Sequence, residues 1–316
     1  MDIAFLIGRR LTTSVITLLL VSAIIFSMVE LLPGDAATRI LGREATPETL
    51  AVVREKLHLD RPAFERYAVW LSGIATGDLG SSLTSDRAIN EILAPRIANT
   101  LLLSLFAFIL YLPLALIPAA AQALNRDRPT DHALSVITLV LLSIPDFLMA
   151  AILLISFVVW LPWLPAKSAI HPGMGFADLL RALVLPGSTL AIVMATYAVR
   201  MLRDNLVEVL ESEYVRMAEL RGLSRGYVLF RHALPNALIP TLNVTALNLA
   251  YLIGGVVIVE RLFAFPGFGS LLVDALQLRD VPLIEATVLI AAAVYIGANL
   301  LADIGAILLN PRLRSQ

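Results

Sequence analysis

Residues 213–240 read EYVRMAELRGLSRGYVLFRHALPNALIP and lie between two long apolar segments of the chain. The stretch carries four arginines and one histidine, whereas the flanking runs at 183–202 and 238–259 are almost free of charge. Charged side chains are costly in a hydrocarbon core, so such an insert indicates a loop at a membrane surface. The class of protein therefore depends on what lies on either side of this stretch.

The composition of the whole chain indicates an integral membrane protein. Of its 316 residues, 58% are hydrophobic and 16% are charged, and the mean hydropathy is +0.82. These values lie outside the range of soluble domains. The net charge of −1 argues against nucleic acid as a partner, because a phosphate-binding surface needs a basic excess. The absence of cysteine excludes disulfides and thiol catalysis, and the four scattered histidines argue against a metal site.

Six apolar runs are long enough to cross a bilayer as helices, since a hydrocarbon core of about 30 Å needs about 20 residues. The runs lie at 11–32, 97–124, 133–161, 183–202, 238–259 and 283–309. They are continuous rather than alternating, which favours helices over a barrel. The first run is expected to be an uncleaved span rather than a signal peptide, because no small-residue cleavage site follows it.

Prolines mark two kinds of position in these spans. Three lie inside the second and third spans, where they are expected to kink the helix: Pro113, Pro118 and Pro145. Three others fall near predicted span starts, where a missing N–H costs little: Pro186, Pro240 and Pro282.

Basic residues in the short loops predict the orientation. With the N-terminus in the cytoplasm, twelve arginines fall on the inner side and four basic residues fall in short outer loops. This agrees with the excess of positive charge in cytoplasmic loops. The long segment 33–96 carries eight basic and nine acidic residues and is predicted to be a solvated extracytoplasmic subdomain. The stretch 213–240 and both termini are then cytoplasmic.

The local structure of the stretch can be predicted from its breakers. Residues 213–220 favour a short helix, Gly222 is placed to end it with a left-handed turn, and Ser224 can cap a second helix that stops before Pro235. Two interpretations remain open from physics alone. The pair of helices is either a basic loop on the lipid surface or a docking element, in which Ala218 and Gly222 form a small-residue notch for a partner protein.

These residues resemble the EAA loop of permease subunits of binding-protein-dependent ABC importers, whose pattern is Glu-Ala-Ala, three residues and Gly. Arg216, Met217 and Ala218 stand in the three leading positions, and Gly222 is the glycine. The departures at the first two positions are typical of the peptide and nickel branch. Further stretches match that branch in order: LLPGDAATRILGREATPE, LHLDRPAFERYAVWL, GDLGSSL, SIPDF and VERLFAFPGFGSLLVDALQLRDVPL. The second span departs, because it has Pro113 and Pro118 where the family usually has glycines.

The resemblance implies an all-α polytopic membrane protein with the type I ABC importer permease fold and six transmembrane helices. It places the cytoplasmic N-terminus and first helix at 1–32, an extracytoplasmic insert at 33–96 and the permease core at 97–316. A coupling loop at 205–235 lies between the fourth and fifth helices. The residues expected to contact an ATPase are Arg216, Met217, Ala218, Gly222, Leu223 and Ser224.

The resemblance also implies a transporter of several chains in a bacterial or archaeal plasma membrane. Its expected partners are a second homologous permease subunit, two ATPase subunits and an extracytoplasmic solute-binding protein. ATP and Mg would be bound by the ATPase subunits, so no cofactor is expected in this chain. The residues support this independently, because the chain has only two lysines and neither follows a glycine, which excludes a P-loop. No arrangement of residues predicts an enzyme.

Two rival classes differ in what they require. An ion-coupled secondary transporter needs charged residues at the membrane midplane, usually in repeated halves, but Asp146 is the one acid clearly inside a span and no internal repeat is found. A purely structural subunit needs no spans kinked by proline. Asp146 could face the solute pathway or begin a broken helix after Pro145. Asn243 and Asn248, with Thr241 and Thr245, could line the pathway or bond neighbouring helices.

Two acids near the outer ends of the last spans are candidates for contact with the binding protein. They are Glu260 and Asp280, and local pairs with Arg261 and Arg279 are the alternative. The expected solute is a peptide, with an oligosaccharide, a nickel chelate or glutathione as alternatives within the same branch.

Overall fold

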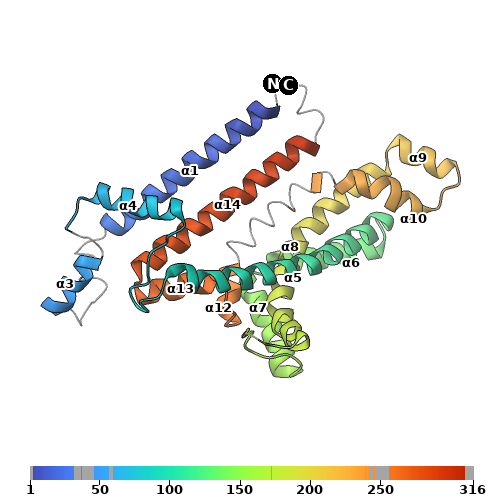
Figure 1. Ribbon diagram of the computed structural model, residues 1–316. Coiled ribbons are helices and arrows are strands. Elements are labelled where there is room, and N and C mark those ends of the chain that lie inside the picture. Colours follow the sequence, from blue (N-terminus) through green and yellow to red (C-terminus); the bar gives the residue numbers. More distant parts are fainter. Residues whose placement is uncertain are drawn as a thin grey trace. The chain divides into compact units, whose positions relative to one another are not determined.

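The computed structural model describes residues 3–31, 37, 46–56, 60–171, 173–238, 240, 241, 245 and 256–309. Within these ranges every regular element is helical, and β-structure is limited to an isolated bridge between Ser81 and Ala88. The helices form two compact units, Met1–Asn99 with Gly267–Gln316 and Thr100–Pro266. Figure 1 shows the helices of both units. The all-helical class predicted from the continuous apolar runs is confirmed.

Four helices are long and apolar enough to cross a membrane. They are α1 (Ile3–Leu31), α5 (Ile89–Leu124), α8 (Phe176–Leu210) and α14 (Val281–Leu309). A fifth candidate is a bent pair made of α6 (Pro129–Ser143) and α7 (Asp146–Leu154), which continues as the π-helix η2 (Ile155–Trp160). The apolar run at 238–259 falls mostly on residues outside the described ranges. The structure therefore has four to five of the predicted spans.

The bend between α6 and α7 measures 105° and lies at Pro145. Proline disfavours helical dihedrals in the residue before it and cannot donate a backbone N–H. Ile144 is accordingly extended, with φ −86° and ψ 119°, and α7 starts directly after the proline. The kink predicted at Pro145 is confirmed. By contrast, α5 is one continuous helix that includes both Pro113 and Pro118.

The fourth span starts earlier than its apolar run suggests. Helix α8 begins at Phe176, so Pro186 lies inside the helix. The prediction that Pro186 lies near the start of its span is therefore wrong. Gly175 is extended before the helix, and Asp178 places a negative charge in the first turn, where it complements the helix dipole. Gly175 and Asp178 therefore favour a helix start before the apolar run.

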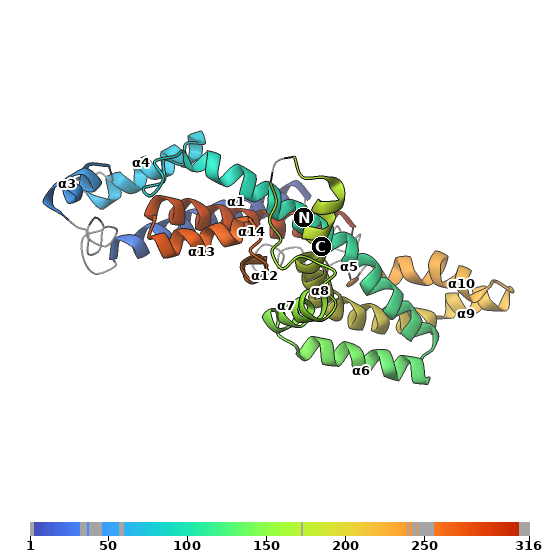
Figure 2. The same ribbon diagram turned by 90° about the horizontal axis from the view of Figure 1, so that it is seen from below.

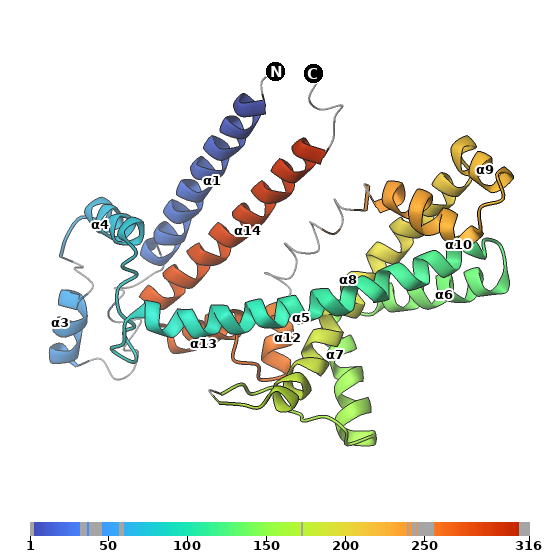
Figure 3. The same cartoon turned by 45° about the vertical axis from the view of Figure 1, so that its right-hand side comes forward.

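In the first unit, α1 and α14 run side by side (Figures 1 and 3). Helix α4 (Ala63–Thr76) packs on α1, where the Tyr67 hydroxyl lies 2.8 Å from the Ser22 hydroxyl and Arg66 pairs with Glu30 at 2.5 Å. Helix α13 (Phe268–Leu278) packs on α14. Only 11% of the apolar stretch of α1 is buried, so most of its apolar side chains face outward, as suits a helix in lipid. Helix α3 (Pro47–Lys56) also belongs to this unit.

Residues 77–88 of the same unit are held against the start of α14 by Asp280. This carboxylate is fully buried and accepts hydrogen bonds from the hydroxyls of Ser82 (2.5 Å) and Thr84 (2.9 Å) and from the backbone N–H of Leu83 (3.2 Å). It also accepts from the N–H of Leu283 at 3.4 Å and so caps α14. The predicted contact of Asp280 with a binding protein is wrong, because its oxygens are buried and occupied within the chain.

The second unit is built around α8. Of the apolar stretch of α8, 72% is buried, and α6, α7 and α12 (Val256–Leu262) pack on it (Figure 2). Gly187 lets α5 approach closely, because a Cβ at this position would lie 2.4 Å from the ring of Phe106. Glu260 of α12 is fully buried and accepts a hydrogen bond from the Thr100 hydroxyl at 2.5 Å. Its predicted contact with a binding protein is therefore also wrong.

Candidate functional site

The stretch that begins after α8 folds into two short helices joined by a tight turn. They are α9 (Glu213–Leu220) and α10 (Arg225–Val228), and α10 continues as the π-helical turn η3 (Leu229–Ala233). Figure 3 shows this pair at the end of α8 away from α7. We call residues 213–233 the α9–α10 hairpin. The predicted pair of short helices is confirmed.

Gly222 makes the turn between the two helices. Its φ of +82° lies in the left-handed region that side chains rarely adopt. The N–H of Gly222 donates to Glu219 O at 2.9 Å, and the N–H of Leu223 donates to Ala218 O at 3.4 Å, which is the hydrogen-bond pattern of a Schellman motif. Ser224 then caps α10 by accepting from the N–H of Tyr227 at 3.4 Å. The predicted left-handed turn at Gly222 and the predicted cap at Ser224 are confirmed.

Ala218 points into the hairpin and not outward. It is 8% exposed and packs in a small apolar cluster with Val215 and Val228. The predicted notch open to a partner is therefore wrong at Ala218. The physical reason is helical spacing: Val215 and Ala218 are three residues apart, so they share the face of α9 that covers α10. A small side chain is needed there because two helices meet.

The opposite face of α9 presents an exposed apolar stripe. Tyr214, Met217 and Leu220 follow the same spacing of three residues, and their side chains are 46%, 52% and 76% exposed. The sequence prediction includes Met217 but not Leu220. The spacing of three residues could have indicated Leu220, because it places Leu220 on the same face of the helix as Tyr214 and Met217. Large apolar side chains gathered on an exposed short helix are typical of an interaction surface.

The remaining residues of the predicted coupling set lie around this stripe. All four are exposed: Arg216 lies on α9, and Gly222, Leu223 and Ser224 lie in the link between α9 and α10. Contact of any of them with an ATPase stays a prediction.

The prediction that the second helix stops before Pro235 is wrong. Residues 234–238 are helical as well. The π-helical turn η3 ends two residues before this proline and widens the backbone around residue 231, whose carbonyl the proline ring would otherwise crowd. Asn236 ties the segment to α9 by donating to the Tyr214 hydroxyl at 3.0 Å, and it also donates to His232 O of η3 at 2.8 Å.

The predicted pathway residues are spread over two regions. Asp146 is half-buried and is the first residue of α7 after the break, where a carboxylate complements the helix dipole. This position fits the interpretation that it begins a broken helix, and its role in a pathway stays a prediction. Asn243 and Asn248 lie outside the described residues.

The threonines of the same stripe bond neighbouring helices. Thr241 is buried and accepts a hydrogen bond from the amide of Asn205 on α8 at 3.2 Å. The Thr245 hydroxyl lies 3.0 Å from the hydroxyl of Tyr111 on α5. The interhelical alternative is therefore confirmed for these two residues.

A buried ion pair that the sequence does not predict joins α6 to α8. Asp131 is 2% exposed and accepts from Arg203 through both oxygens, at 2.9 Å from Nε and 2.6 Å from Nη2. The N–H of Asp127 adds a third hydrogen bond at 3.1 Å. The sequence gives little indication of this ion pair, because the two charged residues lie near the ends of different apolar runs and no neighbouring residue shows that they meet.

Within the described part of the chain, no three His, Asp or Glu side chains gather in a group that could hold a metal ion. The geometry instead defines a class. Long helices with outward apolar side chains belong to a multi-pass membrane protein, and the hairpin of short helices is an exposed part of it.

Comparisons with known proteins identify the family. Residues 111–315 match the model for the Binding-protein-dependent transport system inner membrane component, and residues 2–103 match the model for the N-terminal part of such membrane components. The chain belongs to this family. It is therefore a permease subunit of a binding-protein-dependent transport system and a multi-pass protein of the inner membrane.

Relatives match over nearly their full length. A putative peptide transport system permease protein of Brucella abortus is 35% identical over 98% of each chain. A probable peptide ABC transporter permease protein of Sinorhizobium fredii is 33% identical over 97% of this chain and 98% of the relative. A glutathione transport system permease protein of Salmonella choleraesuis is 34% identical over 97% of each chain.

Proposed function

We propose that this chain forms half of the solute pathway of an ABC importer that takes up peptides or peptide-like solutes such as glutathione. The relatives named for peptide and glutathione transport support this solute class, because they match over 97–98% of this chain. In this proposal the apolar run at 238–259 supplies the span that completes a type I fold of six helices. Residues 33–96 form the extracytoplasmic insert.

The single observation that carries the coupling role is the surface of the α9–α10 hairpin. Its own apolar cluster is closed, yet it leaves Met217 and Leu220 more than half exposed. Apolar side chains that the chain itself does not cover suit a protein partner that covers them. We therefore assign this surface to an ATPase subunit, which binds ATP and Mg and transmits its movement through the hairpin to α8.

The other partners follow from the same proposal. A second homologous permease completes the pathway, and an extracytoplasmic binding protein delivers the solute. The hairpin and both termini lie in the cytoplasm. The orientation is tested with single thiols, since the chain has no cysteine. An impermeant thiol reagent outside intact cells should label Ser81→Cys and not Ser224→Cys, both of which replace exposed residues. The reverse pattern would overturn the orientation.

Uptake of a labelled dipeptide tests the function. The chain is reconstituted in liposomes with its partner permease, ATPase subunits and binding protein. Uptake should require ATP and the binding protein and should persist when a protonophore removes the proton gradient. Uptake by this chain alone, driven by an ion gradient, would support a secondary transporter instead.

A further inference from the structure

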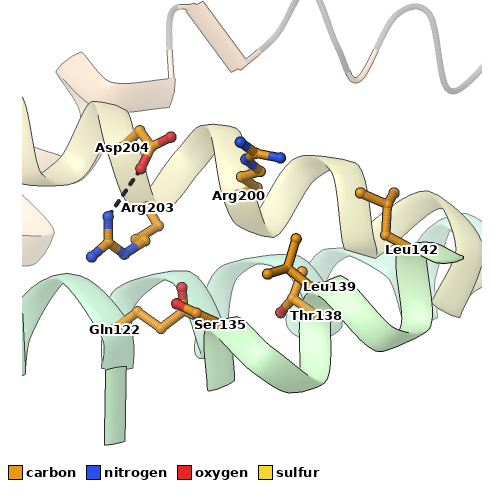
Figure 4. A pocket seen from close by; sticks show the side chains of 8 residues that line it. All are labelled: Gln122, Ser135, Thr138, Leu139, Leu142, Arg200, Arg203 and Asp204. Carbon is orange, nitrogen blue, oxygen red and sulfur yellow. Dashed lines mark hydrogen bonds and ion pairs between the residues drawn. The ribbon is translucent and has the colours of Figure 1, made fainter. Parts of the chain in front are cut away.

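A cavity of about 290 Å³ is lined by residues of α5, α6 and α8 (Figure 4). Gln122 comes from α5, Ser135 from α6, and Arg200 and Arg203 from α8. In Figure 4 Gln122 extends from its helix toward Ser135. The volume is enough for a small polar group but not for a folded partner segment.

The strongest sign of a ligand is the side-chain amide of Gln122. The residue is 1% exposed, and its Nε2 has no hydrogen-bond partner among the described residues. Buried polar groups are nearly always paired, so a buried N–H donor without a partner needs an acceptor that the chain does not supply. The ligand must therefore carry a hydrogen-bond acceptor at this end of the cavity.

One basic side chain of the cavity lining has no acidic partner in the described chain and is open to an acidic group of a ligand. Arg203 pairs with Asp131 at 2.6 Å and with Asp204 at 3.0 Å, so that this group of three carries one negative charge. Arg200 is exposed and has no acidic partner among the described residues. These two arginines and two aspartates sum to no net charge, and Arg200 is the guanidinium of the lining that no acid of the described chain pairs.

The cavity changes from polar to apolar along α6. Leu139 and Leu142 lie one to two helical turns beyond Ser135, toward the middle of the apolar segment. The polar end lies where the apolar run of α5 ends at Leu124. This is the level of the lipid headgroups in a bilayer. A ligand with an anionic head and an apolar tail fits both halves of the lining.

We propose that this cavity binds an anionic phospholipid. The Gln122 amide donates to a phosphodiester oxygen, Arg200 neutralises its charge, and the acyl chain lies along Leu139 and Leu142. Basic pockets between membrane helices bind anionic headgroups in this way. The lipid would hold α6 against α8 next to the Asp131–Arg203 pair.

The test measures lipid retention and thermal stability of the full chain. The delipidated protein receives equal amounts of phosphatidylglycerol and phosphatidylcholine, and bound lipid is counted by native mass spectrometry. Wild type should retain phosphatidylglycerol preferentially and gain thermal stability from it. Arg200→Gln should bind it about five-fold more weakly, the equivalent of ~1 kcal/mol for one basic residue at the headgroup level.

Two further variants separate this site from general charge attraction. Gln122→Leu removes the amide without removing charge, and it should weaken the binding of phosphatidylglycerol and reduce its stabilising effect. Arg9→Gln removes one charge from an exposed residue of α1 that does not line the cavity, and it should leave both readouts unchanged.

Three outcomes would overturn the proposal. Equal retention of the two lipids would remove the anion preference, and unchanged binding in Gln122→Leu would remove the cavity as its location. Stabilisation by inorganic phosphate in phosphatidylcholine, to the same extent as by phosphatidylglycerol, would identify a soluble anion as the ligand.

Discussion

The α9–α10 hairpin and the segment 77–88 are both short segments that connect longer helices, but they are held in different ways. The segment is fixed by hydrogen bonds from Ser82, Leu83 and Thr84 to the buried carboxylate of Asp280. The hairpin is held by a small apolar cluster of Val215, Ala218 and Val228. Outside that cluster its exposed stripe has no cover within the described chain.

This difference in how the two segments are held indicates different roles. A segment whose polar groups are satisfied by one buried acid is complete without a partner. A hairpin with a minimal core and exposed Met217 and Leu220 leaves apolar surface for another protein. Substitutions in the segment should therefore affect the stability of this chain, whereas substitutions on the hairpin stripe should affect assembly.

The largest effect is expected at Asp280. Asp280→Ala leaves several buried donors of residues 82–84 without an acceptor and removes the cap of α14. The loss should be about 3–5 kcal/mol of unfolding free energy, because each unsatisfied buried group costs ~1–3 kcal/mol. Thermal unfolding in detergent measures the stability, and trypsin cleavage after the exposed Arg87 reports release of the segment.

Glu91→Ala is the matched control for this prediction. It removes an exposed acid of the same unit, whose pair with Arg87 spans 3.8 Å. Such exposed pairs contribute ~0–1 kcal/mol, so stability and cleavage should barely change. Equal effects of the two substitutions would contradict the role given to Asp280.

The second effect is expected inside the hairpin. Ala218→Trp overfills the cluster with Val215 and Val228 and should cost about 1–3 kcal/mol, because a closed core accommodates added volume only with strain. Hydrogen exchange of residues 213–233 should rise. Leu220→Trp is the matched control at an exposed position and should leave this exchange unchanged. Similar exchange in both variants would show that Ala218 faces outward after all.

A smaller effect is expected at the turn. A Cβ at Gly222 meets no atom within 4 Å, so the cost of substitution comes from its φ of +82° alone. Gly222→Val should cost ~1–2 kcal/mol, and Gly222→Asn should cost less because asparagine tolerates this region. Solute uptake should fall in that order while membrane insertion stays normal. Equal uptake by Gly222→Val and wild type would contradict a coupling role for the turn.

The smallest effect is expected at Ser224. Its hydrogen bond to the N–H of Tyr227 is long, at 3.4 Å. Ser224→Ala should therefore cost at most about 0.5–1 kcal/mol, the lower end of the range for N-caps. Ser224→Asp keeps an acceptor and should match wild type in hydrogen exchange of α10. A larger loss in Ser224→Ala would mean that the hydroxyl also contacts a partner.

The sequence predicts the features that depend on local signals. Continuous apolar runs predict the helices, and Gly222 and Ser224 predict the turn and cap of the hairpin, because each needs only its chain neighbours. The break at Pro145 is predicted for the same reason. Helix α8 shows the limit of this approach, since polar residues before its apolar run start the helix early.

The features that depend on distant residues are not predicted. Asp280 finds Ser82 198 positions away, so its burial cannot be inferred from an acid near a span end. Asp131 meets Arg203 72 positions away. Ala218 matches the family pattern, but the pattern does not show that α10 covers it. The helix also passes Pro235 because the π-helical turn η3 accommodates the ring, which no simple rule on proline indicates.

The central claim, that the exposed stripe of α9 docks an ATPase subunit, is tested most directly by cross-linking from residue 220. Because the chain has no cysteine, Leu220→Cys provides a single thiol for a photo-reactive maleimide in the assembled transporter, with Ser81→Cys as the control. The docking proposal predicts a covalent adduct with an ATPase subunit from residue 220 and none from residue 81. Adducts from residue 220 with lipid only would contradict it and would support the alternative of a basic loop on the membrane surface.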